Sequence, residues 1–323
     1  MRILIVNTSE RTGGAAVAAH RLMEALNNNG EKAKMLVRDK QSNDISVAEL
    51  PRSWRLRWNF LRERLTIFRH LGFKRTHLFG IDIANTGTDI TRLKEFKEAD
   101  IIHLHWINQG MLSLKNIRKI VDSGKPIVWT MHDAWPTTGI CHVTLGCRNF
   151  QTECGRCKYL DRRHPGKDLS TLVWKQKQQL YAKSNIYFVA CSHWLESEAK
   201  KSALLKGMQI TNIPNPIDTR QFHPGNKNEI RKQLNLPADK RLLLFAAQRV
   251  NNQFKGMDYL EEAFRLLAER QPKLKQQLAL MILGGNSTEC EFNASGFEVF
   301  PFDFTTNTHQ IVQYFQAADG FVL

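Results

Sequence analysis

The stretch MRILIVNTSERTGGAAVAAHRLMEALNNNG, residues 1–30, decides the fold class. Residues 3–6 are an apolar run typical of a buried parallel strand, and the polar turn that follows ends at Gly13 and Gly14. A helical pattern then continues until Gly30, a residue type that commonly ends helices. The stretch therefore predicts a strand, a glycine turn and a helix, which together are the repeating unit of a parallel sheet.

The same alternation of apolar runs and helical patterns continues along the chain. It predicts an α/β protein in which helices cover both faces of parallel, doubly wound sheets. Further strands are expected at residues 32–37, 99–107, 126–133, 186–192, 208–215, 241–250, 278–285, 297–302 and 320–323, and helices at 112–123, 256–270 and 309–319.

A stretch rich in proline, IPNPIDTRQFHPGNKNE, indicates a boundary between two domains. We predict a first Rossmann-like domain at residues 1–218, a linker at 219–240 and a second Rossmann-like domain at 241–323. The second domain supplies about four strands, whereas a doubly wound domain usually has five or six. It is therefore expected to be incomplete.

The composition is that of a globular protein with a basic surface. The 323 residues are 42% hydrophobic and 24% charged, which excludes a disordered or collagen-like chain. The net charge of +15 favours an anionic partner: a nucleic acid, a phosphorylated small molecule or an acidic membrane leaflet. The sequence shows neither a signal-peptide core nor an apolar stretch of about 18 residues, so a cytoplasmic location is expected.

Two predicted helix N-termini are candidate anion sites. The turn at Gly13 and Gly14 opens the first helix to a phosphate or a sugar hydroxyl, although a tight turn without a ligand is the alternative. In the second domain, Arg249 and Lys255 flank the loop before the helix that Gly256 opens. Two cations near a helix N-terminus suit a diphosphate, whereas solvated surface charges are the alternative.

Histidines end two predicted strands of the first domain. His132 and Asp133 close the strand at 126–133, at the edge where parallel sheets bind ligands. His132 is expected to exchange a proton or to hydrogen-bond a sugar hydroxyl, and a loop histidine satisfied by the backbone is the alternative. His103 and His105 alternate on one strand, and we favour packing over a shared metal for this pair.

Four cysteines form a candidate metal site. Cys141, Cys147, Cys154 and Cys157 lie in the run CHVTLGCRNFQTECGRC, which ends in a CxxC pair. Four thiolates at this spacing suit a structural zinc ion, and His142 is a spare ligand. Disulfide or redox chemistry and coincidence are the alternatives.

Residues 51–76 combine eight Arg or Lys residues with one Glu. Their apolar stripe at helical spacing is Trp54, Trp58, Leu61, Leu65 and Phe68. A cationic helix with an aromatic stripe is typical of a helix that lies on an anionic membrane leaflet, and similar features occur in nucleic-acid binders. The alternative is a stripe that packs in the core below a solvated basic face.

Five segments taken together resemble the retaining glycosyltransferases of family 4. They are, in order, NTSERTGGAAVAAHRL, IIHLHWINQGMLSL, VWTMHDAWPTTGICH, IPNPIDTRQFHP and AAQRVNNQFKGMDYL. The resemblance implies a GT-B fold, in which two Rossmann-like domains face a cleft that holds the active site. The cysteine-bearing insertion at about residues 139–160 is similar to that of a subgroup associated with capsular or exopolysaccharide assembly.

In the first domain, the resemblance implies that Gly13 and Gly14 border the cleft for acceptor and donor. His132, with Asp133 beside it, matches the family's cleft histidine. The position of His132 at the carboxyl end of a parallel strand points to a ligand at the same place.

In the second domain, the resemblance implies that Arg249 and Lys255 hold the donor diphosphate and stabilise the leaving nucleotide. Gly284 and Gly285 match the turn after the next strand. Phe302 lies in the segment that matches the region packing on the nucleobase. No catalytic cofactor is implied.

These expectations describe a retaining transferase that moves a sugar from a nucleotide-diphosphate donor to a glycan or lipid-linked acceptor. The reaction is expected in surface polysaccharide biosynthesis, at the inner membrane face. Family members continue beyond the last predicted strand, so a truncated, non-catalytic remnant that keeps acceptor and membrane binding is one alternative. A zinc-stabilised nucleic-acid binder is the other, but no nucleic-acid-binding module is recognisable, and nucleic acid is not the expected partner.

Overall fold

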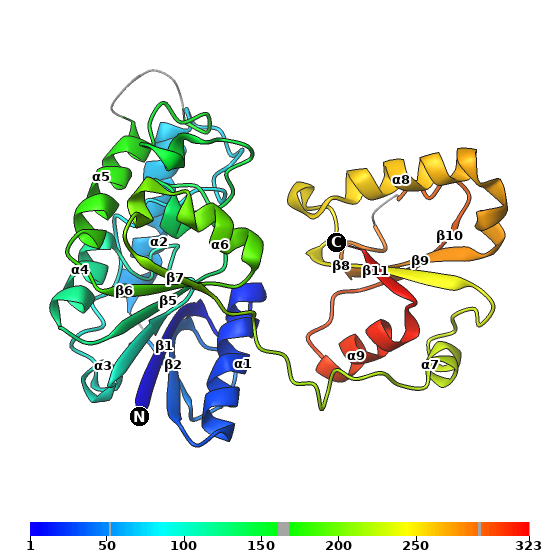
Figure 1. Ribbon diagram of the computed structural model, residues 1–323, viewed down its shortest axis with the longest axis horizontal. Coiled ribbons are helices and arrows are strands. Elements are labelled where there is room, and N and C mark those ends of the chain that lie inside the picture. Colours follow the sequence, from blue (N-terminus) through cyan, green and yellow to red (C-terminus); the bar gives the residue numbers. More distant parts are fainter. Residues whose placement is uncertain (52, 161–167, 290–291, 323) are drawn as a thin grey trace. The chain divides into compact units, whose positions relative to one another are not determined.

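The computed structural model describes residues 1–51, 53–160, 168–289 and 292–322. The chain divides into two compact units, Met1–Pro216 and Ile217–Leu323, which are described separately. Each unit contains one parallel sheet with helices packed on it (Figure 1). The prediction of an α/β protein with two parallel sheets is therefore confirmed.

The sheet of the first unit has seven strands in the order β3-β2-β1-β4-β5-β6-β7. The strands are β1 (Arg2–Ser9), β2 (Lys32–Asp39), β3 (Val47–Glu49), β4 (Ile101–Leu104), β5 (Ile127–Met131), β6 (Ile186–Ala190) and β7 (Gln209–Asn212). All neighbouring strands run parallel. The order reverses beside β1, and ligands bind such sheets at the carboxyl ends of the strands next to the reversal.

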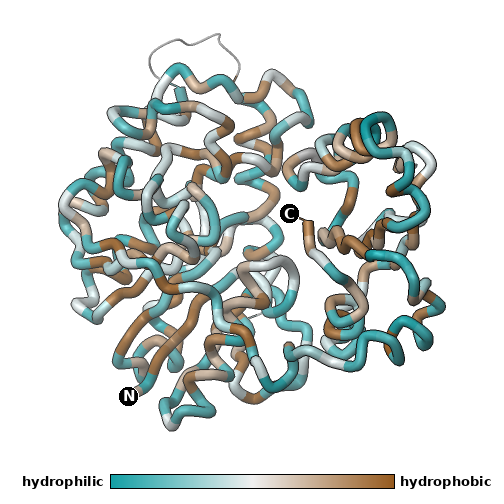
Figure 2. The backbone as a smooth tube through the Cα atoms, turned by 45° about the vertical axis from the view of Figure 1, so that its right-hand side comes forward, coloured by the Kyte–Doolittle hydropathy of each residue, from teal (hydrophilic) through white to brown (hydrophobic). Residues whose placement is uncertain are grey.

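Helices cover both faces of this sheet. They are α1 (Gly14–Asn28), α2 (Trp54–His70), α3 (Lys94–Glu98), α4 (Leu114–Asp122), α5 (Leu169–Tyr181) and α6 (His193–Lys200). Ile3 and Ile5 of β1 pack with α1 in one core, whereas Leu4 and Val6 point into the larger core on the opposite face. Figure 2 shows the strand that starts near the N-terminus as a hydrophobic segment, as expected for a strand buried on both faces.

The second unit has a four-stranded parallel sheet in the order β10-β9-β8-β11. Its elements are α7 (Lys227–Gln233), β8 (Arg241–Arg249), α8 (Met257–Arg270), β9 (Leu278–Gly285), β10 (Glu298–Phe302), α9 (Thr308–Ala317) and β11 (Gly320–Val322). Side chains of α8 pack on one face of the sheet, and side chains of α7 and α9 pack on the other. Both faces of the sheet are therefore covered.

Part of the segment predicted as a linker, residues 219–240, folds as helix α7. Ile230 of this helix packs in the core of the second unit. The guanidinium of Arg231 lies 2.6 Å from the carboxylate of Asp319 and donates a hydrogen bond to the carbonyl of Ala317 at 2.9 Å. These contacts make α7 part of the second unit.

Candidate active site

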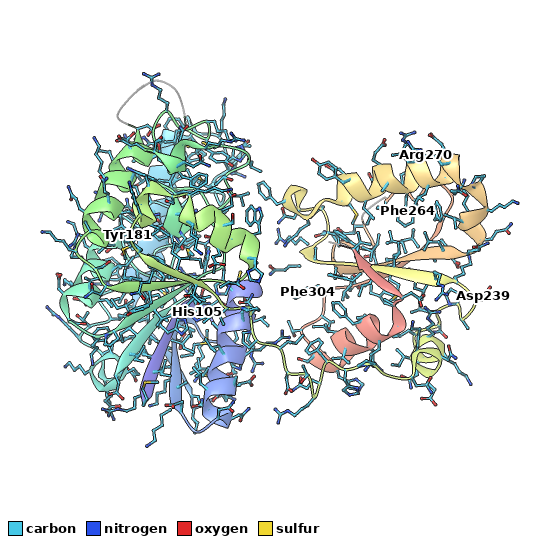
Figure 3. The ribbon with its side chains drawn as sticks, in the orientation of Figure 1. His105, Tyr181, Asp239, Phe264, Arg270 and Phe304 are labelled. Atoms are coloured by element: carbon cyan, nitrogen blue, oxygen red, sulfur yellow. The ribbon has the colours of Figure 1, made fainter. Side chains whose placement is uncertain are left out.

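The carboxyl edge of the first sheet brings together the end of β1 and the segment that follows β4. The N–H of Thr8 donates to the carbonyl of Trp106 at 2.8 Å, and the N–H of Trp106 donates to Oδ1 of Asn7 at 2.8 Å. Nε2 of His105, a residue labelled in Figure 3, and Nδ2 of Asn108 are buried and have no hydrogen-bond partner among the described residues. Such atoms are usually satisfied by water or a ligand, so we take this edge as the candidate site of the first unit.

The glycine turn after β1 leaves α1 with an open N-terminus. Gly13 precedes the helix with a φ of 92°, and no side chain caps the helix. A Cβ added at Gly13 or Gly14 meets nothing within 4 Å. The free N–H groups and the positive end of the helix dipole are therefore accessible to a phosphate or a hydroxyl group, which favours the ligand-binding interpretation of this turn.

Three histidine rings lie close together at the same edge. Nε2 of His132 lies 2.9 Å from Nδ1 of His105, and the ring of His103 lies 4.4 Å from that of His105. Burial lowers the pKa of His132 to about 4, although the charge of Asp133 opposes this shift. His132 is therefore uncharged at neutral pH. This state favours a hydrogen bond to a sugar hydroxyl over proton exchange, the other role predicted for His132.

Asp133 is held by hydrogen bonds from the protein itself. Its carboxylate accepts from the N–H of Trp135 at 2.8 Å, from Nε1 of Trp106 at 2.9 Å and from Nδ1 of His142 at 2.7 Å. These hydrogen bonds give Asp133 a positioning role, because its carboxylate fixes the loop that follows His132. A contact between Asp133 and a ligand stays a prediction.

His142 bridges two carboxylates, because its Nε2 also lies 2.6 Å from Oδ2 of Asp82. Burial alone lowers the pKa of His142, but the charge of Asp133 and the hydrogen bonds to Asp133 and Asp82 raise it to about 10. Both ring nitrogens then carry a proton and donate. His142 is consequently occupied, and its predicted role as a spare zinc ligand is wrong.

The same network of charges reaches helix α2. Arg64 forms an ion pair with Asp82 and donates to the carbonyl of Leu78 at 2.6 Å. The carboxylate of Glu63 accepts from the N–H of Ala84 at 2.7 Å, and burial together with the charge of Asp82 raises the pKa of Glu63 to about 7. Neither Glu63 nor Asp82 was predicted, because no motif or spacing marks them.

Lys177 of α5 is a buried lysine that holds the segment after β5. Its Nζ donates to the carbonyls of Trp135 at 2.5 Å and of Thr138 at 3.0 Å, and it lies 3.4 Å from the centroid of the Trp135 ring. Burial lowers the pKa of Lys177 to about 7. The sequence gave no signal for this contact, since lysines on helices usually face water.

In the second unit, the connection between β8 and α8 carries the predicted basic pair. Arg249 ends β8 and lies opposite Gly285 of β9, whereas Lys255 precedes α8 in a short turn in which its N–H donates to the carbonyl of Asn252 at 2.8 Å. Both basic side chains are exposed. Gly256 opens the 14-residue helix α8 without a side-chain cap. Two cations and a free helix N-terminus on one connection suit a diphosphate.

Gly284 and Gly285 bring the end of β9 close to β8. A Cβ added at Gly284 would lie 1.9 Å from the carbonyl oxygen of Ala247, so only glycine fits this position. A Cβ added at Gly285 would lie 3.0 Å from the carbonyl oxygen of Gln248 and 3.9 Å from the side chain of Arg249. The two glycines therefore place the backbone of β9 directly beside Arg249.

Phe302 packs inside the second unit. Its ring lies 4.6 Å from the ring of Tyr314 on α9, and it contributes to the core below β10. The structure therefore gives Phe302 a packing role and does not support the predicted contact with a nucleobase. Phe304 is 49% exposed, and its Cβ lies 3.9 Å from a Cβ built at Gly285, which makes it the better candidate (Figure 3).

The predicted zinc site is not assembled in the structure. Among the described residues, no group of three or more His, Cys, Asp or Glu side chains is arranged to hold a metal ion. Burial raises the pKa of Cys154 to about 12. Zinc therefore stays a prediction from the sequence.

Elemental analysis tests this prediction. Four cysteine thiolates hold one ion, so protein purified in metal-free buffer is expected to contain about one equivalent of zinc. A Cys147→Ser, Cys154→Ser variant is expected to lose it, whereas Cys191→Ser is the matched control and is expected to keep it. Less than about half an equivalent in the unaltered chain contradicts the prediction.

The two parallel-sheet units define the class of the chain, a GT-B-like α/β protein. The crystal structure of a glycosyltransferase from Rickettsia africae ESF-5 matches with a TM-score of 0.56. The match covers 99% of this chain and 72% of that chain at 12% sequence identity, so it concerns the fold alone. The model of the family described as Glycosyltransferase Family 4 matches residues 12–221. The chain belongs to glycosyltransferase family 4.

The chain is similar to two curated proteins over part of its length. It is 34% identical over 88 residues to a protein of Escherichia coli (strain K12) named as a colanic acid biosynthesis glycosyl transferase, WcaC, covering 25% of this chain and 22% of the relative. It is also 34% identical over 138 residues to a protein of Bacillus subtilis (strain 168) named as a teichuronic acid biosynthesis glycosyltransferase, TuaC. That match covers 42% of this chain and 31% of the relative, so less than a third of either relative is matched.

Proposed function

We propose that the chain transfers a sugar from a nucleoside-diphosphate sugar to a hydroxyl group of a glycan or lipid-linked acceptor. The bond between the anomeric carbon and the diphosphate oxygen breaks, and the nucleoside diphosphate leaves with the electron pair. The acceptor oxygen forms the new bond to the anomeric carbon, and its proton passes to an oxygen of the leaving diphosphate. The configuration at the anomeric carbon is retained.

The observation that carries this proposal is the connection between β8 and α8. Negative charge grows on the diphosphate as the glycosidic bond breaks, and groups that stabilise this charge lower the barrier. Arg249, Lys255 and the N-terminus of α8 supply three such groups on one short segment. The proposal includes no catalytic cofactor, because these groups provide the positive charge that the leaving diphosphate needs.

The first unit supplies the binding groups for the sugar and the acceptor in this proposal. The open N-terminus of α1 after Gly13 and Gly14 offers free N–H groups. The uncharged ring of His132 is suited to hydrogen-bond a sugar hydroxyl. In the second unit, exposed Phe304 offers a ring face for the nucleobase next to Gly285.

The relatives support a role in surface polysaccharide biosynthesis, because both are named for the synthesis of such polymers. A lipid-linked acceptor is held at a membrane by its lipid chain. We therefore place the reaction at the inner membrane face, with the protein on the cytoplasmic side.

Scanning calorimetry with UDP-, GDP- and ADP-sugars tests the proposal. A ligand that binds only the native state raises its stability, by about 2.7 kcal/mol at a concentration about 100 times Kd. One nucleotide class is expected to raise the unfolding temperature by several degrees. Lys255→Ala is expected to abolish the shift, and Lys273→Ala, which alters an exposed lysine of the same unit, is expected to leave it unchanged.

A folded chain whose unfolding temperature responds to none of these donors contradicts the proposal. It favours the alternative that the chain is a non-catalytic remnant.

A further inference from the structure

Helix α2 presents an apolar face to solvent. Trp54, Trp58, Leu61 and Leu65 are 71%, 56%, 55% and 60% exposed, and their spacing places them on one side of the helix. We name these four side chains the α2 stripe. Contiguous exposed apolar surface marks an interaction site on a folded protein.

The opposite side of α2 is attached to the first unit by charged groups. Glu63 is fully buried and accepts from the N–H of Ala84 at 2.7 Å. Arg64, 6% exposed, donates to the carbonyl of Leu78 and pairs with Asp82. A helix that buries charges and exposes tryptophans reverses the usual amphipathic arrangement. The alternative in which the stripe packs in the core is therefore wrong for these four residues.

Cationic side chains accompany the α2 stripe. Arg55, Arg57 and Arg62 are exposed on the same helix, and Lys74 is exposed shortly after its end. Glu63 is the helix's single acidic residue, and it is buried. The solvent-facing surface of α2 is therefore apolar and positively charged, with no acidic side chain on it.

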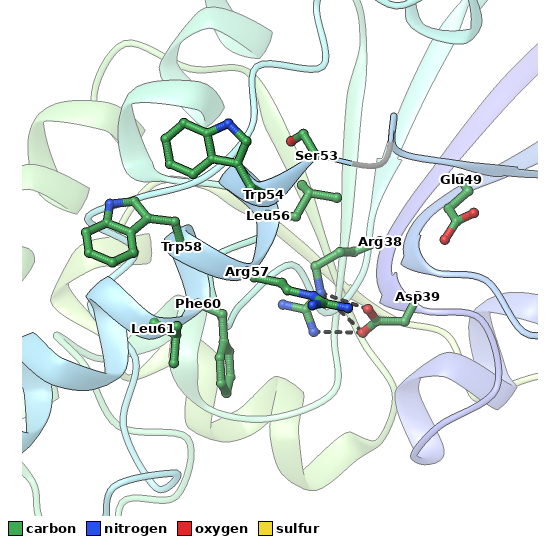
Figure 4. Close-up of a pocket in the computed structure, with 10 residues that line it drawn as sticks. All are labelled: Arg38, Asp39, Glu49, Ser53, Trp54, Leu56, Arg57, Trp58, Phe60 and Leu61. Carbon is green, nitrogen blue, oxygen red and sulfur yellow. Dashed lines mark hydrogen bonds and ion pairs between the residues drawn. The ribbon is translucent and has the colours of Figure 1, made fainter.

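A groove with a volume of about 1030 Å³ joins the α2 stripe to the sheet (Figure 4). Its lining includes Trp54, Trp58 and Leu61 from the helix, and Arg38 and Asp39 at the carboxyl end of β2. The stripe is thus continuous with the sheet edge that carries the candidate site.

We propose that α2 docks on an anionic lipid bilayer. The two tryptophans and two leucines of the stripe lie at the boundary between headgroups and acyl chains, where indole rings are favoured. The guanidinium groups of Arg55, Arg57 and Arg62 contact the lipid phosphates. Charge complementarity favours the bilayer as the partner. The same face of α2 carries apolar side chains that can insert between lipids and arginines that attract anionic headgroups.

A helix that lies on a bilayer differs from a helix that crosses it. Within the residues that the structure describes, no helix has the length and hydropathy to cross a bilayer. The inference also stands apart from the proposed transfer reaction, because vesicle binding is measured without a donor.

Co-sedimentation with lipid vesicles tests the inference. The full chain is expected to pellet with vesicles of phosphatidylcholine and phosphatidylglycerol, and much less with phosphatidylcholine alone. Replacing Trp58 and Leu61 by serine removes half of the stripe and is expected to weaken binding by about tenfold or more. Arg55→Glu, Arg57→Glu, Arg62→Glu is expected to weaken it by about a hundredfold at low salt.

Matched controls distinguish the role of α2 from a general loss of exposed apolar or positively charged side chains. Trp194 and Leu172 are 67% and 51% exposed elsewhere in the first unit, so replacing both by serine matches the apolar variant. Lys115→Glu, Lys206→Glu, Lys273→Glu matches the charge reversal with exposed lysines outside α2. Both controls are expected to bind vesicles like the unaltered chain.

Two results overturn the inference. One is equal vesicle binding by the unaltered chain and by both α2 variants. The other is binding of an RNA or DNA oligonucleotide that the arginine variant loses, with no vesicle binding by the unaltered chain, which assigns the surface to nucleic acid. Unchanged unfolding temperatures of the variants show that they are folded, so that weaker vesicle binding reports the surface itself.

Discussion

Replacing His142 by alanine is expected to lower the free energy of unfolding of the first unit by about 3–5 kcal/mol. The substitution removes the imidazolium that bridges Asp82 and Asp133 and leaves two carboxylates without their shared partner. Asp82 is fully buried, so its carboxylate is shielded from bulk water and keeps Arg64 as its remaining charged partner. Denaturant unfolding followed by tryptophan fluorescence measures the change in this unit, because all 7 tryptophans lie within residues 1–216.

The pH dependence of the free energy of unfolding tests whether the charge on His142 is the cause of the stabilisation. Histidine in an unfolded chain has a pKa of about 6.5, whereas the pKa of His142 in the folded chain is about 10. The native state therefore keeps the extra proton. The contribution of His142 is complete below about pH 6.5 and is lost as the pH rises toward 10. The difference in stability between the unaltered chain and the variant should shrink over this range.

His193→Ala is the matched control, because the side chain of His193 is 91% exposed. Its effect is expected to stay within about 0.5 kcal/mol. If His142→Ala is equally mild, the bridge does not stabilise the first unit, and the interpretation of this network is wrong.

Lys255→Ala and Arg249→Ala are each expected to lower the rate of donor turnover by about 100-fold to 1000-fold. Each substitution removes a positive charge from the place where the diphosphate is proposed to leave. Both side chains are exposed, so the unfolding temperature without ligand should change little. Release of nucleoside diphosphate from the donor, measured over a range of donor concentrations, separates kcat from KM.

Arg249→Lys refines this test. The variant keeps the charge but loses the planar pair of donors, so a partial recovery of turnover is expected. The matched control is again Lys273→Ala, which should leave turnover unchanged. Unchanged kcat and KM in both alanine variants contradict the proposed role of the basic pair.

Much of the fold follows from the pattern of apolar residues. The strand predicted at 278–285 coincides with β9, and the helix predicted at 256–270 differs from α8 by its first residue. The run at 99–107 contains the shorter strand β4, because the N–H of Trp106 donates to the side chain of Asn7 in β1 and not to a backbone carbonyl. Local patterns reveal which segments are buried, whereas long-range hydrogen bonds decide where a strand ends.

The site was predictable only in part, because local sequence patterns do not report contacts between distant residues. Arg249 and Lys255 stood out because they flank a strand–helix connection. The bridge from Asp133 through His142 to Asp82 joins residues far apart in sequence, and periodicity carries no information on such contacts. Spacing likewise placed Trp58 and Leu61 on one face of α2, but only the contacts of its buried charges show that this face points to solvent.

Gly284 has a practical consequence for protein engineers who wish to change donor choice. Any residue other than glycine at this position puts a carbon atom against the carbonyl oxygen of Ala247, so library members that carry such a residue are expected to misfold. Phe304 lies close by and is half exposed, so it is expected to accept other residues without disturbing the sheet. A useful library therefore holds position 284 constant and samples position 304.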